Sequence, residues 1–255
     1  MKRAKKLIGL LLSAAVLALT PLTALALPAG GYVPTSATRY TLNKSTNKWE
    51  KLTTITYNYT NSGKLTKRTV KWDGGSCSHT YTWNGNYITK HKFKTLNTSY
   101  YVSEEYTFKN DKLLTFKTKE YGHNDGKYPN IKWKGKTGTM TWKDGHKTKY
   151  TVNKKGQLIK ETDGAETTTY EYYKNGNLKR ITRKENGRTL STKKFNQKGY
   201  ITSKAYTYTI KNGKITKLVI KDSDGTRKYV FNKWKKVSHI RNCDAWGTYI
   251  DLDWF

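Results

Sequence analysis

The chain has 255 residues, and its 49 Lys and Arg against 18 Asp and Glu give a formal net charge of +31. A charge this large predicts solubility, self-repulsion and attraction to polyanions such as nucleic acid, anionic glycan or acidic lipid, without choosing among them. Scarce aliphatic residues with high charge ordinarily indicate disorder, but all 20 Tyr and 8 Trp lie beyond residue 30 and argue against it. Such large β-formers can bury the area that an aliphatic core would otherwise supply.

The first 26 residues have the pattern of a signal peptide. A basic start, MKRAKK, precedes an apolar run from Leu7 to Leu19 and the sequence Ala24-Leu25-Ala26. A membrane anchor would need about 20 apolar residues, whereas Thr20-Pro21 interrupts this run. We therefore expect export, cleavage near Leu27 and no transmembrane segment after cleavage. Without the four cations of this segment, 45 basic residues face 18 acidic ones, a net charge of +27.

After this segment, residues 27–38 are rich in Pro, Gly and Ser and predict a flexible lead-in. A β-hairpin motif then repeats through residues 39–243. In its clearest copy, residues 167–189, an alternating Thr and Tyr strand is followed by the turn Asn175-Gly176, a return strand and a second turn at Asn186-Gly187. The aromatic, turn and aliphatic positions of the copies are Tyr57/Tyr59, Gly63 and Leu65; Tyr81/Trp83, Gly85 and Ile88; Tyr106/Phe108, Asn110 and Leu113; Tyr150/Val152, Gly156 and Leu158; Tyr170/Tyr172, Gly176 and Leu178; Phe195, Gly199 and Ile201; Tyr208/Ile210, Gly213 and Ile215; and Tyr229/Phe231, Trp234 and Val237.

This periodicity predicts an all-β fold, an array of antiparallel β-hairpin repeats that forms an extended, twisted sheet. The alternating, acidic and aromatic segment 244–255 is expected to be a C-terminal capping strand that caps or closes the array. In an open, flat sheet Cys77 and Cys243 would lie on the order of 70 Å apart, whereas a disulfide needs Cα atoms within about 7 Å. Because the units offer no corner residues for closure, we expect an open sheet with two free or separately exposed thiols.

The unit TTTYEYYKNGNLKRITRKENG resembles the YD repeats of bacterial RHS-type proteins, in which a Tyr-x-Tyr strand, a Gly turn and a Leu-containing return strand recur. The resemblance covers most of residues 50–240 and is closest at 167–184 and 193–204. Where the family usually has Asp after the second aromatic, this chain has other residues, such as Thr60 and Asn84. The resemblance implies a secreted or surface-displayed antiparallel sheet that binds carbohydrate, without implying a specific site.

Catalytic and metal-binding patterns are weak. The five His show no spacing that presents two metal ligands together and are each expected at the surface. Carboxylates such as Glu104, Glu161, Asp163 and Glu166 could pair for acid/base work, as glycosidases require. In so basic a chain they are better interpreted as counter-charges to neighbouring Lys and Arg. We therefore expect no catalytic residues, no metal and no cofactor.

The recurring exposed chemistry is a cation beside an aromatic ring. Rings offer flat faces to sugars or bases, and flanking cations hold phosphate or carboxylate; the alternative is cross-strand packing of the rings inside the sheet. The candidate ligand-binding residues are Trp72, Trp133, Lys134, Trp142, Lys143, Trp234 and Lys235.

We therefore expect a non-enzymatic protein, secreted or held at the extracellular cell surface, that binds an anionic polysaccharide or a teichoic-acid-like polymer, and nucleic acid only non-specifically. A secreted hydrolase of glycan or cell wall and a purely structural spacer are the alternatives. A clustered, partly buried carboxylate pair would favour the hydrolase, whereas carboxylates scattered among lysines would favour binding. The sequence leaves the oligomeric state open.

Overall fold

The computed structural model describes residues 30–95, 100–120, 126–127, 129–241 and 243, and the described part is built of strands and turns without a helix. The predicted signal peptide (1–26) and the predicted capping strand (244–255) lie outside the described residues. The strands are β1 (Gly31–Asn43), β2 (Lys48–Tyr59), β3 (Leu65–Trp72), β4 (Gly75–Asn84), β5 (Tyr87–Thr95), β6 (Tyr101–Lys109), β7 (Lys112–Glu120), β8 (Gly126–Lys127), β9 (Lys132–Lys134), β10 (Thr137–Thr141), β11 (Lys147–Val152), β12 (Leu158–Asp163), β13 (Glu166–Tyr172), β14 (Leu178–Glu185), β15 (Arg188–Lys194), β16 (Tyr206–Lys211), β17 (Lys214–Asp222) and β18 (Gly225–Val237).

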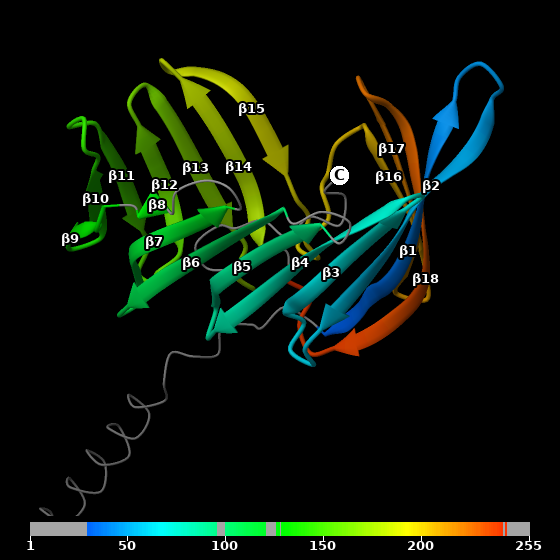
Figure 1. The fold of residues 1–255 in the computed structure, drawn as a ribbon, viewed down its shortest axis with the longest axis horizontal. Coiled ribbons are helices and arrows are strands. Elements are labelled where there is room, and N and C mark those ends of the chain that lie inside the picture. Colours follow the sequence, from blue (N-terminus) through cyan, green and yellow to red (C-terminus); the bar gives the residue numbers. More distant parts are fainter. Residues whose placement is uncertain (1–29, 96–99, 121–125, 128, 242, 244–255) are drawn as a thin grey trace, which may run out of the picture.

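The strands form two antiparallel sheets (Figure 1). The first has 11 strands in the order β16-β17-β18-β1-β2-β3-β4-β5-β6-β7-β8, and the second has seven in the order β15-β14-β13-β12-β11-β10-β9. Each order runs between two different edge strands, so neither sheet closes on itself. The prediction of an open, all-β antiparallel fold is confirmed, with the repeat array divided between two sheets.

Hairpin turns occur where the sequence predicts them. Asn186 and Gly187 have φ of 48° and 79°, so both central residues adopt the left-handed conformation that an Asn-Gly turn tolerates. The strands flanking this turn pair locally, from Glu185↔Arg188 to Arg180↔Lys194. Local sequence therefore decides these hairpins.

The pairing of β1 with β18 joins the two ends of the repeat region. The register runs from Gly31↔Val237 to Thr41↔Arg227. Residues 31–38 therefore belong to a strand, which corrects the expected lead-in over 27–38. Composition indicated a flexible segment there because the partner strand is about 200 residues away in the sequence and leaves no local signal.

The 11-stranded sheet curls, and its edges meet those of the seven-stranded sheet (Figure 1). At one junction the backbone N–H of Ile131 donates to the Leu114 carbonyl at 2.7 Å. At the other, Phe195 and Ile201 form an isolated bridge, and Thr202 N–H donates to the Lys194 carbonyl at 2.8 Å. The first hydrogen bond thus links β7 to the segment before β9, whereas the second set lies in the connection from β15 to β16, which folds back on β15.

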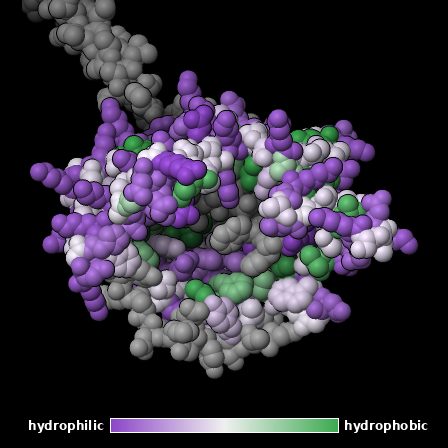
Figure 2. Space-filling model, turned by 90° about the horizontal axis from the view of Figure 1, so that it is seen from above, coloured by the Kyte–Doolittle hydropathy of each residue, from purple (hydrophilic) through white to green (hydrophobic). Residues whose placement is uncertain are grey.

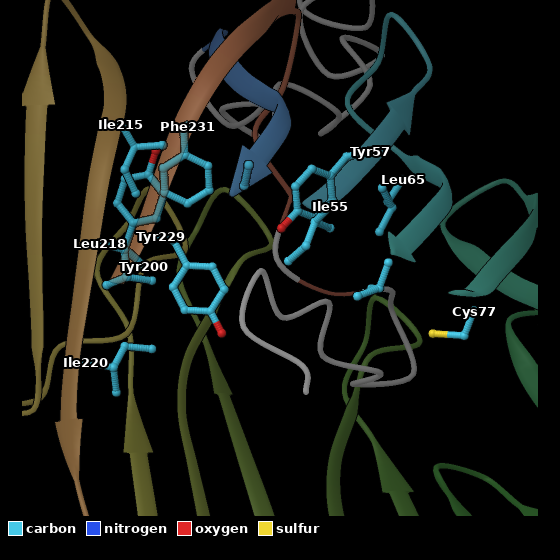
Figure 3. Close-up of a cluster of buried hydrophobic side chains, with 12 residues drawn as sticks. Ile55, Tyr57, Leu65, Cys77, Tyr200, Ile215, Leu218, Ile220, Tyr229 and Phe231 are labelled. Atoms are coloured by element: carbon cyan, nitrogen blue, oxygen red, sulfur yellow. The ribbon is translucent and has the colours of Figure 1, made fainter. Parts of the chain in front are cut away.

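The largest buried cluster lies on the 11-stranded sheet and brings side chains of β17 and β18 near those of β2, β3 and β4 (Figure 3). Tyr57 and Tyr229 are both about 1% exposed within it. Aromatic side chains therefore supply much of this core, as the composition predicts.

Cys77 and Cys243 are free thiols, as expected, and both are buried. The sequence analysis allowed for separately exposed thiols, but the structure buries both of them. They belong to different buried clusters, Cys77 on the 11-stranded sheet and Cys243 beside Leu178, Phe195 and Ile201.

Candidate functional site

A pocket of about 470 Å³ lies where β18, β1 and β2 run side by side. Its lining residues are Thr35 and Ser36 of β1, Thr56, Tyr57, Asn58 and Tyr59 of β2, and Lys233 and Lys235 of β18. Hydroxyl, amide and ammonium groups therefore surround one opening, and none of these lining residues carries a carboxylate.

An irregularity in the β1–β18 ladder shapes this pocket. The register steps from Pro34↔Trp234 to Ser36↔Lys233 and then to Ala37↔Phe231, so Thr35 has no counterpart in it. Bulges of this kind bend a strand and re-aim its side chains. The one sign of this irregularity in the sequence is Pro34, because a Pro within a strand is confined to edges and bulges.

The two lysines of the pocket differ in their roles. Lys235 is partly buried, and its Nζ reaches across β1 to donate to the Tyr59 carbonyl at 2.7 Å. Lys233 is exposed at the bulge. Lys235 therefore holds the strands of the pocket together, while the Lys233 ammonium is available to an anion.

Two of the predicted ligand-binding tryptophans are tied to the backbone. Trp133 Nε1 donates to the Leu113 carbonyl at 2.7 Å, and Trp234 Nε1 donates to the Ile215 carbonyl at 2.9 Å. Trp83, which the sequence interpretation did not single out, makes the same contact with the Leu65 carbonyl at 2.8 Å. In each case the acceptor is the aliphatic residue at the first or second position of a return strand.

A lysine lies over each of these indole rings and precedes the accepting residue in the chain. Lys64 lies 5.7 Å from the Trp83 ring centroid, Lys112 lies 5.6 Å from that of Trp133, and Lys214 lies 5.6 Å from that of Trp234. These distances are within the range of cation–π attraction. The repeat therefore carries a recurring Lys-aliphatic…Trp contact, and we call these three indoles the pinned tryptophans.

The other predicted residues are spread over the molecule. Trp142 Nε1 donates to Thr148 Oγ1 at 2.8 Å. The Trp142 ring also stacks on the His146 ring, with the ring centroids 6.3 Å apart. Trp72, at the end of β3, is 43% exposed. Lys134 and Lys143 are also exposed. The candidate residues belong to β3, β9, the turn after β10 and β18, so they are not gathered at the pocket, which only Lys235 lines.

A chain of hydrogen-bonding side chains crosses β4, β5 and β6. His79 Nδ1 lies 3.0 Å from His91 Nε2, His91 Nδ1 lies 2.9 Å from Glu104 Oε2, and the Tyr106 hydroxyl donates to the same oxygen at 3.1 Å. His79 is 3% exposed, which corrects the expectation that every His is a surface residue. Its alternation with Cys77, which is also buried, was the sequence signal for an inward position.

The electrostatics of this chain favour a neutral His79. Burial lowers the pKa of His79 to about 3, and the neighbouring Arg68 and His91 act in the same direction. The hydrogen bond from His91 lowers the pKa of Glu104 below its usual value against the opposing effect of burial. An imidazole held neutral and a carboxylate held ionised form a stable polar network in the sheet wall.

A second polar cluster lies on the seven-stranded sheet around Glu161 and Asp163 of β12. Burial and the nearby Asp163 raise the pKa of Glu161, while the Tyr170 hydroxyl donates to Glu161 Oε2 at 3.5 Å. Asp163 Oδ1 accepts from Thr148 Oγ1 at 2.9 Å and lies 2.6 Å from His146 Nε2. Two of the carboxylates that the sequence analysis named for acid/base work therefore lie near each other, with Glu161 partly buried and Asp163 exposed.

Other carboxylates are counter-charges, as expected. Glu166 pairs with Arg183 at 2.6 Å, Glu105 with Lys90 at 2.5 Å, and Glu171 with Arg180 at 3.2 Å. Within the described residues, no group of three or more His, Cys, Asp or Glu could hold a metal ion. The same part of the chain contains no helix long and apolar enough to cross a membrane.

Comparisons with known proteins give little further information. No family model and no curated protein sequence matches the chain significantly. A porin-like protein from Bacteroides uniformis aligns with 12% identity and a TM-score of 0.37 over 80% of this chain and 96% of that chain. The Tc holotoxin pore of Photorhabdus luminescens aligns with 13% identity and a TM-score of 0.25 over 73% of this chain and 12% of that chain. Similarities this weak establish neither fold nor function, and the YD-repeat resemblance stays a hypothesis.

Proposed function

We propose that this protein is exported and binds anionic polymers of the cell envelope or extracellular space, without catalysis, as a short YD-like repeat module. The pocket between β18, β1 and β2 carries the proposal, because its lining combines two lysines with hydroxyl and amide groups and lacks acidic side chains. Hydrophilic side chains also dominate the surface around the central hollow in Figure 2. A phosphate or carboxylate group of a polymer fits this chemistry.

The binding mode follows from the charge. A net charge of +27 without the N-terminal segment is spread over nearly every repeat, so a polyanion gains affinity by releasing its counterions along the whole surface. Within the pocket, the Lys233 ammonium contacts one anionic group while Thr56 and Asn58 donate hydrogen bonds. Affinity is therefore strong at low salt and weakly specific.

A salt titration against teichoic acid, heparin and DNA tests this function. We expect the binding constant for all three polymers to fall steeply as salt rises. Lys233→Gln should weaken binding more than Lys174→Gln, which removes the same charge from an exposed turn outside the pocket. Equal losses would contradict a role for the pocket. Tight, salt-independent binding to one neutral sugar would contradict the function and favour Trp72 and Trp142 as stacking surfaces.

Export has its own test. N-terminal sequencing of protein recovered from the medium or envelope should give a first residue near Leu27. Mature protein that retains residues 1–26 would contradict cleavage.

The carboxylate pair on β12 supports a second candidate function, hydrolysis of a glycan. Glycosidases use one protonated and one ionised carboxyl group, and the raised pKa of Glu161 beside Asp163 matches that division. Release of reducing ends from cell-wall glycan should then be abolished by Glu161→Gln and kept by Glu171→Gln, whose parent carboxylate lies in a surface ion pair. Absence of release by the wild-type protein would leave binding as the function.

A further inference from the structure

The hairpin formed by residues 40–53 extends beyond β3, and its outer part pairs only within itself; we call it the tip hairpin. The β1–β18 ladder ends at Thr41↔Arg227, and β3 joins β2 only from Thr54↔Lys71. Farther out, β1 and β2 pair with each other, through Leu42↔Trp49 and Asn43↔Lys48. Figure 1 shows this two-stranded segment in blue, diverging from the orange end of β17 and β18.

Large apolar side chains are exposed at this end of the sheet. Trp49 is 37% exposed and Leu52 is 43% exposed, both on the tip hairpin. Trp72, at 43%, follows Lys71, so the turn after β3 lies at the same end as the tip hairpin. Of the six large apolar residues exposed in the described part of the chain, three are therefore at this end. Grouped exposed apolar side chains mark interaction sites more often than single ones do.

The apolar residues are surrounded by lysines. Lys44, Lys48 and Lys51 are exposed on the tip hairpin, and its one carboxylate, Glu50, accepts a hydrogen bond from the Asn43 amide at 2.7 Å. The turn after β3 adds Asp73. Asp222 and Asp224 lie on the adjacent turn between β17 and β18, and Asp222 is paired with Arg227. The tip hairpin itself is therefore cationic.

Lys228 adds a further cation and occupies one side of the tip aromatics. Its Nζ lies 4.2 Å from the Trp49 ring centroid and 4.7 Å from that of Tyr40. An ammonium at that distance occupies the ring face that a sugar would stack on. The aliphatic Leu52 offers a sugar no hydrogen bond. These features favour an apolar, anionic partner over a polysaccharide.

We propose that the tip hairpin docks on an anionic lipid surface. Trp49 and Leu52 enter the boundary between headgroups and acyl chains, where indole rings are favoured. Lys44, Lys48 and Lys51 contact the lipid phosphates, each strengthening binding about fivefold. The site is separate from the pocket, and the proposal does not depend on polymer binding.

Sedimentation of the full chain with vesicles tests this docking. We expect binding to vesicles of phosphatidylglycerol and phosphatidylcholine, and much weaker binding to phosphatidylcholine alone. Replacement of Lys44, Lys48 and Lys51 by Gln should lower the partition coefficient by on the order of a hundredfold. The matched control replaces Lys154, Lys155 and Lys198, three exposed turn lysines outside the tip hairpin, and should lower it much less. All variants begin at the same residue, so differences among them report on the tip hairpin.

The apolar contribution is tested in the same assay. Trp49→Ser with Leu52→Ser should lower binding at least tenfold, while Leu190→Ser with Ile210→Ser, which are 49% and 46% exposed elsewhere, should leave it unchanged. Quenching by brominated lipid should be reduced in Trp49→Phe. Equal effects of the tip and control variants would overturn the proposal. Two further results would overturn the proposal. In the first, the tip variants still bind vesicles but lose binding to a soluble polysaccharide. In the second, they still bind vesicles but lose self-association in sedimentation velocity.

Discussion

His79 Nδ1 lies 3.0 Å from His91 Nε2, in a contact that links the buried wall of β4 to the ionised Glu104 of β6. One ring nitrogen must donate and the other accept, so the contact requires at least one neutral imidazole. Burial, with the neighbouring Arg68 acting in the same direction, keeps the His79 ring neutral. A buried network of this kind makes the stability of the wall sensitive to acid.

The pH dependence of unfolding should reveal this histidine. Its pKa is lowered from 6.5 to about 3 in the fold. Above pH 6.5 the His79 ring is neutral in both the folded and the unfolded protein. Between pH 6.5 and about 3 the unfolded protein binds a proton at this ring, whereas the folded protein does not. Stability is therefore lost as the pH falls from 6.5 towards 3, at about 1.4 kcal/mol per pH unit. Urea unfolding of His79→Gln at pH 7, 5.5 and 4 should show a shallower slope than wild type. Identical slopes would contradict the assignment.

The contribution of Glu161 to the pH dependence of stability should have the opposite sign to that of His79. Its folded pKa is raised by burial and by Asp163, so the stability that it contributes is present below its ordinary pKa and is lost as the pH rises through the folded value. Glu161→Gln should therefore be more stable than wild type at pH 7, with the difference vanishing in acid below the ordinary glutamate pKa. Thermal unfolding of both proteins at pH 7 and at a pH below the ordinary glutamate pKa measures this difference in stability. As a control, Glu171→Gln removes an exposed, paired carboxylate and should not stabilise the protein.

The pinned tryptophans should contribute to stability through their N–H groups. Trp234→Phe keeps a ring beneath Lys214 but removes the donor to the Ile215 carbonyl. We expect a loss of about 1 kcal/mol in the free energy of unfolding. Trp49→Phe, at an exposed position, should change it by less than about 0.5 kcal/mol. Equal stabilities of the two variants in denaturant titrations would show that the indole hydrogen bond contributes nothing.

Thiol counting should find two reactive groups. Cys77 and Cys243 are free and buried, and burial raises the pKa of Cys77, which keeps it a thiol rather than a reactive thiolate. The native protein should therefore react slowly with a thiol reagent, and the unreduced, denatured monomer should react at both cysteines. A denatured monomer without reactive thiols would mean that the two cysteines are bonded.

Much of the local structure follows from neighbouring residues in the sequence. The Asn186-Gly187 turn and the strands beside it can be predicted because alternation and a left-handed turn are local properties. The sequence also shows an inward alternation for His79 and Cys77, although a His is usually placed outside on composition alone.

The candidate site depends on pairings that local patterns do not encode. The pocket exists because β1 and β18, at opposite ends of the repeat region, form a bulged ladder that brings Thr35 beside Lys233. The proximity of Glu161 to Tyr170 and of Asp163 to His146 likewise depends on the register among β11, β12 and β13.

The amino-acid sequence by itself determined the all-β class, the hairpin units and the strong cationic charge, because each depends on residue type and short spacing. Only the tertiary structure decided that Trp133 and Trp234 are tied to backbone carbonyls while Trp49 and Trp72 remain exposed. All four are aromatic residues with a cation beside or near them in the sequence. Which of them is tied down depends on whether a backbone carbonyl lies within hydrogen-bond distance of its N–H: Ile215 of β17 offers one to Trp234 of β18, and Leu113 of β7 offers one to Trp133 of β9. Strand packing and register set that distance, and residue type alone does not.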